Sequence, residues 1–483
     1  MNIRLVSKLL SILLLIISFF MLIPMGLAFY YNEYDIVPCF LWPIGIVSLL
    51  SGALLIFTRK GGKEILSPRD GFFFVTASWI GASLLGAFPA FLSGAVPSYT
   101  DAFFETMSGF TTTGASILTH IENLPRSILF WRSLTHWLGG MGIIVLTVAV
   151  LPLLGIGGLQ LIRAEAPGPS VDRLTPRIAG TAKILWLIYL GFTVAETLLL
   201  KLGGMDLYDA LTHTFGTLAT GGFSPKNSSV GHYKSAYIDG VVTFFMICAG
   251  TNFALYYKLL NGRFRDFFKD IEFRTYICIF IGAAAVISFS LYREFYHSVG
   301  VSIRYAAFQA ASILTTTGFA TANFDAWPAL AKNVLFVLMF IGGCSGSTGG
   351  GIKVIRIFTL IKLGINEMKY LIHPRGIFIL KIGGKAVTKD IVYSIAGFYF
   401  IYISSLLIVL FVVATSGQDI LTSISTALVT VGNIGPGFSK IGPTLNYAFY
   451  PHYVKWVLSM AMLIGRLELY TVLVIFTYQF WKK

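Results

Sequence analysis

Four short segments combine glycine with small or β-branched residues in a way that could line a path for a bare cation. They are Thr112-Thr113-Gly114, Ala219-Thr220-Gly221, Thr316-Thr317-Gly318 and Thr430-Val431-Gly432. Glycine accepts the dihedral angles that bring successive carbonyl oxygens onto one line, and β-branched residues favour extended backbone. Potassium filters consist of four such strands, whose carbonyl oxygens replace the water shell of the ion. The segments therefore predict a potassium filter with all four walls in one chain.

The types of ligand in these segments point to a monovalent ion. Neither Asp nor Glu occurs in them, whereas rings of carboxylates are typical of filters for divalent cations. Threonine hydroxyls at one end of each strand could add neutral oxygen ligands. A single Thr-Thr-Gly triplet would be interpreted as an ordinary turn, but four triplets at the same predicted depth favour the filter.

The composition of the chain is that of a polytopic membrane protein. Of its 483 residues, 55% are hydrophobic and only 12% are charged, against about 25% charged in soluble domains. The net charge of +14 could suggest nucleic acid. The basic residues, however, lie between apolar stretches, as membrane topology predicts, and not clustered with aromatics on one soluble face. We expect membrane lipid as the surroundings and no nucleic-acid partner.

Ten apolar stretches are long enough to cross a bilayer, which needs about 20 residues each. They cover residues 9–30, 38–57, 72–95, 130–154, 182–202, 238–259, 274–292, 332–361 (interrupted), 390–415 and 454–478. The connections at 59–63, 163–183, 258–274 and 356–389 are rich in Lys and Arg. By the positive-inside rule these connections and both termini are cytoplasmic.

The filter segments lie in the alternate connections, each after a short apolar stretch. These stretches, at residues 100–109, 207–216, 301–314 and 420–428, are too short to span and are interpreted as re-entrant helices. Their negative C-terminal ends would favour a cation. The predicted fold is an all-α polytopic membrane protein with four helix, re-entrant loop, helix repeats around one pore. We expect an N-terminal helix pair at 1–65 and repeats at 66–165, 166–265, 266–375 and 376–483.

Residues 342–351 form the first candidate gate. Six of these ten residues are glycine, including Gly346, Gly349, Gly350 and Gly351, and so many glycines cannot sustain a helix. A mobile loop under the filter could block ions, or it could be a passive kink. A phosphate-binding loop is disfavoured, because Ile352 separates the last glycine from Lys353.

Arg466 is the second candidate gate. It lies near the middle of the last predicted crossing, where a charge is costly unless it faces water or a partner. Glu468 could neutralise it, but residues two apart on a helix face different ways. We therefore favour an arginine that faces the pore and raises the barrier to cations.

The filter segments, residues 131–142 (WRSLTHWLGGMG) and residues 342–351 together resemble the bacterial TrkH potassium-uptake subunits of the Trk/Ktr/HKT superfamily, over essentially the whole chain. The resemblance implies K⁺ as the permeating ion, with a glycine in each filter repeat. A serine in the first repeat goes with sodium transport in some plant members, and this chain has Gly114. Gly222, Phe319 and Asn433 stand where a channel filter has tyrosine, so weaker selectivity over sodium is expected.

The resemblance also implies partners. It implies a homodimer in the cell inner membrane and a cytosolic TrkA-like ring of RCK domains that controls opening, so a nucleotide would act only through that partner. Potassium symport driven by sodium or protons remains the alternative. An enzyme is not expected, because the chain lacks a cluster of His and carboxylate residues at an interface and a visible nucleophile and base.

Overall fold

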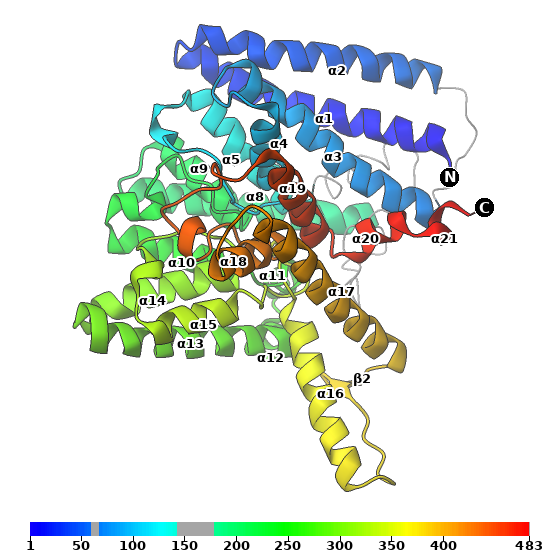
Figure 1. Cartoon of the computed structure of the whole chain (residues 1–483), viewed down its shortest axis with the longest axis vertical. Helices are drawn as coiled ribbons and strands as arrows, with labels where there is room; N and C mark the ends of the chain where they lie inside the picture. Colours follow the sequence, from blue (N-terminus) through cyan, green and yellow to red (C-terminus); the bar gives the residue numbers. More distant parts are fainter. Residues whose placement is uncertain (59–66, 143–177, 483) are drawn as a thin grey trace.

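The computed structural model describes residues 1–58, 67–142 and 178–482. In these ranges the regular elements are helices, apart from one short antiparallel hairpin of β1 (Lys381–Ile382) and β2 (Lys385–Ala386) and an isolated bridge between Ile341 and Ile352. The N-terminal helices α1 (Ile3–Tyr30) and α2 (Val37–Phe57) pack against each other, and α1 also packs against α3 and α5. The pair lies along one side of the body (Figure 1).

The rest of the chain repeats one pattern four times: a first helix, a short helix and a second helix. The first repeat consists of α3 (Pro68–Leu92), α4 (Tyr99–Phe110) and α5 (Arg126–Gly140), and the second of α8 (Ile178–Leu202), α9 (Leu207–Leu218) and α10 (Ala236–Ala249). The third consists of α13 (Ile271–Leu291), α14 (Val299–Leu314) and α15 (Ala329–Leu338), and the fourth of α17 (Lys389–Ala414), α18 (Ile420–Val431) and α19 (His452–Arg466). The short helices, which we call pore helices, have 12 or 16 residues. At 1.5 Å per residue they are too short to cross a bilayer, as the sequence predicts.

The four repeats surround one axis in chain order. The second helix of one repeat packs against the pore helix of the next: α5 against α9, α10 against α14, and α19 against α4. Repeats three and four meet through aromatic rings. The ring centre of Phe438 lies 5.4 Å from that of Phe324 and 6.4 Å from that of Phe336, which belongs to α15. The contact between α19 and α4 closes the ring, because it joins the last repeat to the first.

The second helices are interrupted more often than the sequence indicates. Six helices of the described ranges are long and apolar enough to cross a membrane, or up to eight if each bent pair forms one span. The bent pairs are α10 with α11 (Phe253–Leu260), at 96°, and α19 with the segment that begins at α20 (Tyr470–Leu473), at 114°. Only the stretch at 332–361 was expected to break. Residues Glu468 and Leu469 adopt positive φ values of 56° and 57° at the second bend, which an α-helix cannot accommodate.

Some expectations fall outside the described residues. These are the part of the predicted crossing 130–154 that follows residue 142, the basic connection at 59–63, and most of the connection at 163–183.

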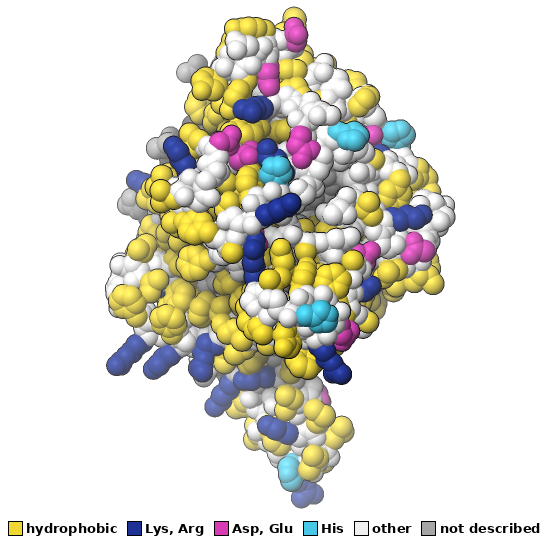
Figure 2. Space-filling model, turned by 90° about the vertical axis from the view of Figure 1, so that its left-hand side faces the viewer, with side chains coloured by type: hydrophobic (Ala, Val, Ile, Leu, Met, Phe, Trp, Pro, Cys, Tyr) yellow, Lys and Arg dark blue, Asp and Glu magenta, His cyan; other side chains and the backbone are white. Residues whose placement is uncertain are grey.

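One arm projects from the helical body (Figure 1). It consists of α16 (Val354–Ile372) and the hairpin that leads back to α17. Figure 2 shows Lys and Arg side chains gathered over the lower part of the molecule, where this arm lies. The remaining short helices are α12 (Phe264–Lys269) and α21 (Tyr478–Trp481).

Candidate functional site

The backbone after each of the four pore helices repeats the same pair of positive φ values. Shortly after the end of each pore helix, one residue has a positive φ: Thr112 (51°), Thr220 (54°), Thr316 (59°) and Asn433 (54°). Two residues later a glycine does so: Gly114 (80°), Gly222 (74°), Gly318 (82°) and Gly435 (91°). Positive φ is a genuine outlier for a β-branched residue such as threonine. Such strain persists only when the surrounding structure holds it, and it concentrates at functional sites.

This shared conformation shifts the register that the sequence indicates in two repeats. Gly222 and Gly435, and not Gly221 and Gly432, are the structural equivalents of Gly114 and Gly318. Gly432 instead follows the last residue of α18, with φ −79°.

Thr430 and Val431 lie in the last turn of α18, so the prediction that they belong to an extended strand was wrong. Their β-branched side chains favour extended backbone, but the Thr430 hydroxyl donates to the Thr426 carbonyl oxygen at 2.7 Å. Both side chains are buried. Tertiary packing thus overrides the local preference.

The equivalent glycines form a closed ring of backbone contacts. A Cβ atom on Gly114 would lie closer than 3.0 Å to the carbonyl oxygen of Gly221, one on Gly222 would meet that of Thr317, one on Gly318 that of Ile434, and one on Gly435 that of Thr113. Each glycine therefore lets its own wall touch the carbonyl group of the next wall, and the fourth touches the first. The ring brings four carbonyl oxygens from equivalent positions around the common axis.

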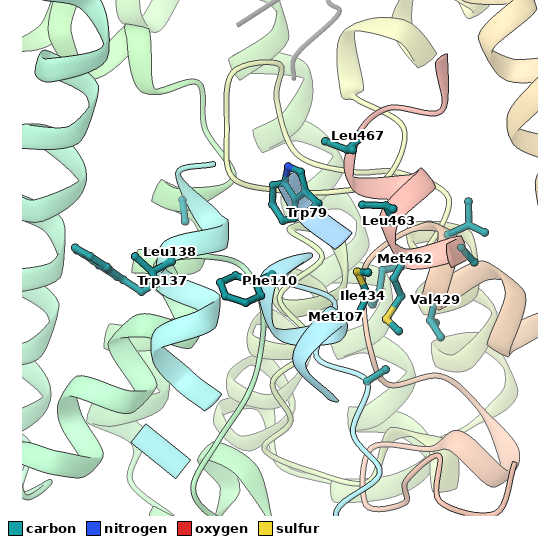
Figure 3. Packing of buried hydrophobic residues seen from close by; sticks show 14 of the residues in the cluster. Trp79, Met107, Phe110, Trp137, Leu138, Val429, Ile434, Met462, Leu463 and Leu467 are labelled. Carbon is teal, nitrogen blue, oxygen red and sulfur yellow. The ribbon is translucent and has the colours of Figure 1, made fainter. Parts of the chain in front are cut away.

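Threonine hydroxyls mostly bond within the protein. Thr111 pairs with Thr113 at 2.8 Å in the first repeat, and Thr315 pairs with Thr317 at 2.7 Å in the third. The Asn433 amide donates to the Thr113 hydroxyl at 2.9 Å and to the Met462 carbonyl at 2.9 Å. Figure 3 shows that Ile434, the residue after Asn433, groups with Met107 and Met462. Asn433 thus ties the fourth wall to the first.

The glycine-rich segment forms a loop between α15 and α16, as the sequence predicts. Its Gly350 N–H donates to the Thr316 hydroxyl at 2.7 Å. A Cβ on Gly350 would lie 2.6 Å from the Gly432 carbonyl oxygen, and one on Gly349 would lie 3.2 Å from that of Thr315. Thr315 and Gly432 directly follow their pore helices. The loop therefore lies against the end of the filter that joins the pore helices, which we call the inner end.

Arg466 joins this loop to the first repeat. Its guanidinium donates to the Thr348 carbonyl of the loop at 2.6 Å, and to the Gly139 and Gly140 carbonyls of α5 at 2.7 and 3.0 Å. Glu468 pairs with Arg356 of α16. The two candidate gates, Arg466 and the glycine loop, are in direct contact.

Two further residues hold the loop: Glu272, which the sequence did not single out, and Lys353, which it considered only as part of a disfavoured phosphate-binding loop. Glu272 accepts hydrogen bonds from Ser345 N at 2.7 Å, within the glycine-rich segment, and from Ile355 N at 3.1 Å, after it. Lys353 donates to the Gly349 carbonyl. An acidic residue in the first turn of a helix is common for local reasons, so nothing in the sequence marked Glu272 as a partner of a loop more than 70 residues away.

The geometry can be compared with known proteins. A family model described as "TrkH: Cation transport protein" matches residues 43–483. The chain is 40% identical over 486 residues to the Trk system potassium uptake protein TrkH of Halomonas elongata, and 39% identical over 488 residues to that of Escherichia coli K12. Each alignment covers 100% of both proteins.

A solved structure agrees with these relatives. The crystal structure of the potassium transporter TrkH from Vibrio parahaemolyticus matches with a TM-score of 0.89 at 37% identity, and 100% of each chain is covered. The family model, the identities over the whole chain and the shared fold show that the chain belongs to the TrkH family of cation transport proteins.

Proposed function

We propose that the chain forms the pore for potassium uptake across the bacterial inner membrane, with both termini cytoplasmic. The observation that carries the proposal is the closed ring of glycines and carbonyl oxygens at Gly114, Gly222, Gly318 and Gly435. The relatives are themselves named potassium uptake proteins. Membership of the family makes the chain a transporter and not an enzyme.

The ring suits potassium for a physical reason. Backbone carbonyl oxygens are neutral and can replace the hydration shell of a monovalent ion, as in four-fold channels. The walls differ, however: Ala115, Phe223, Phe319 and Pro436 follow the four glycines. Unequal walls hold fewer equivalent sites, so we expect moderate preference for potassium over sodium.

The glycine loop and Arg466 act as one gate in this proposal. The loop covers the inner ends of the third and fourth walls, and Arg466 ties it to α5 below the first wall. A fixed positive charge and a backbone obstruction at this place both oppose the passage of a cation. Opening then requires that the hydrogen bond from Arg466 to Thr348 be broken.

A partner would supply the energy for opening. We propose a homodimer whose cytoplasmic face binds a TrkA-like ring of RCK domains, so that a nucleotide regulates the pore only through the partner. The support is the connection between the gate and the projecting arm: Lys353 and Arg356 bind the loop and the Glu468 bend, and α16 begins at Val354. A force on α16 would reach the loop directly.

Purified protein in liposomes with an imposed potassium gradient tests the proposal. The fluxes of K⁺, Rb⁺ and Na⁺ are compared for the wild type and for Gly114→Ser, which puts a side chain against the Gly221 carbonyl at φ +80°. We expect K⁺ and Rb⁺ to exceed Na⁺ in the wild type and the ratio to fall in the variant. The absence of selective flux in any condition would defeat the pore. Flux that needs a sodium or proton gradient would identify coupled symport instead.

A further inference from the structure

We propose that Arg132 is a positioning residue that sets the shape of the first two filter walls, and with it the preference for potassium over sodium. The inference rests on the proposed function, because it concerns the selectivity of that filter. Arg132 belongs to the segment 131–142, of which Gly139 and Gly140 accept hydrogen bonds from the candidate gate residue Arg466. The inference gives a role to another part of this segment.

Arg132 and Glu105 form a buried ion pair behind the first wall. Arg132 Nε lies 2.6 Å from Glu105 Oε1, and each side chain is only 7% exposed. The same carboxylate accepts from the Ser116 hydroxyl at 2.9 Å and from the Ile117 N–H at 2.8 Å. Ser116 and Ile117 follow Gly114 within three residues. The ion pair therefore holds the chain where it leaves the first filter segment.

Arg132 also reaches the second wall. Its guanidinium carbon lies 3.5 Å from the centre of the Phe223 ring, and its Nη1 donates a hydrogen bond to the Ser224 carbonyl oxygen at 3.1 Å. Phe223 directly follows Gly222. Arg132 thus contacts the residues after Gly222 directly, and it reaches those after Gly114 through Glu105.

His136, one helical turn further along α5, completes this contact. Its ring stacks on that of Phe223 with 4.0 Å between the ring centres. A Cβ atom on Gly221 would lie 2.5 Å from Nδ1 of His136. Residues four apart lie on the same face of a helix. This face of α5 is therefore the back wall of the second filter segment.

A lysine could not replace Arg132 here. Arginine presents several donors in a rigid plane that can bind a carboxylate and stack on an aromatic ring, whereas lysine offers one compact ammonium group. In a site shielded from water, a lost partner is not replaced by solvent. Loosening the residues after Gly114 and Gly222 would change the spacing of the carbonyl oxygens while the charge balance of the site is kept.

The test compares two arginine-to-lysine variants in the liposome assay. Arg132→Lys is the variant of interest. Arg304→Lys is the matched control. Arg304 lies in the first half of α14, and its Nε binds Oδ2 of Asp239 on α10 at 2.7 Å, nearly the same distance, without involving a filter segment. We expect the K⁺/Na⁺ flux ratio to fall about tenfold in Arg132→Lys, the effect of one lost charge-assisted hydrogen bond, and to stay unchanged in Arg304→Lys.

Three results would overturn the inference. They are an unchanged ratio in a folded Arg132→Lys protein, an equal fall in Arg304→Lys, and a lower Tm with less total flux at the wild-type ratio. If Arg132→Lys does not fold, Phe223→Leu removes the stacked ring and keeps an apolar side chain, and the same fall in the ratio is expected; a wild-type ratio in this variant would overturn the inference. A wild type without selective flux would instead refute the proposed function.

Discussion

Replacing Arg466 with Gln should open the pore in the absence of a partner. Among the described residues the guanidinium donates to the loop at Thr348 and to the end of α5 at Gly139 and Gly140. Glutamine is shorter and uncharged, so it cannot bridge the two elements. The loop would then lose its tie to the first repeat.

The size of the effect follows from these bonds. Hydrogen bonds made by charged groups contribute about 1.5–3 kcal/mol each, and water in the opened pore would compensate for part of the loss. If the net loss equals one such bond, the ratio of open to closed protein rises by about 10- to 150-fold, since each 1.4 kcal/mol is a factor of ten. Flux through a mostly closed pore should rise in the same proportion until the open state dominates.

The assay is Rb⁺ uptake into liposomes loaded with potassium, normalised to the amount of folded protein. Arg304→Gln is the control, because it removes an arginine–carboxylate interaction with Asp239 from a partly buried site without touching the loop. Arg466→Lys separates charge from bonding: a closed pore in this variant would assign the barrier to the charge. Unchanged or lower flux in a folded Arg466→Gln protein would refute the role of Arg466 in the gate.

Three other substitutions test neighbouring parts of the site. Gly350→Ala puts a Cβ 2.6 Å from the Gly432 carbonyl oxygen and should push the loop off the filter; Rb⁺ uptake should rise, while Gly364→Ala, which meets open space on α16, leaves it unchanged. Glu272→Ala leaves two backbone N–H groups near the loop without their acceptor, at about 1–3 kcal/mol each; faster hydrogen exchange at Ser345 and higher basal flux are expected, and unchanged protection of Ser345 would contradict the clamp. Gly435→Ala forces a Cβ toward the Thr113 carbonyl at φ +91°, which costs about 1–3 kcal/mol in backbone strain alone; the K⁺/Na⁺ ratio should collapse, and a normal ratio would count against the register.

The sequence was sufficient for the architecture, and the family resemblance drawn from it is confirmed. Apolar stretches of helical length, short stretches that cannot span, and glycines that follow them are local patterns, and the physics behind each acts within about 20 residues. The same holds for the loop at 342–351, where many glycines in succession exclude a helix whatever surrounds them. The boundaries of the four repeats and the topology of the termini stay predictions.

The tertiary structure alone decided the register of the filter and the composition of the gate. Gly222 and Gly435 take the ring positions because α9 ends at Leu218 and α18 extends to Val431, so each glycine lies four residues after the end of its pore helix. Arg466 meets Thr348, Gly139 and Gly140 across 118 to 327 residues of sequence. Arg132 likewise stacks on Phe223, which belongs to another repeat. A sequence shows which residues can carry a charge or break a helix, but the partner that satisfies each of them is chosen by the packing of distant segments.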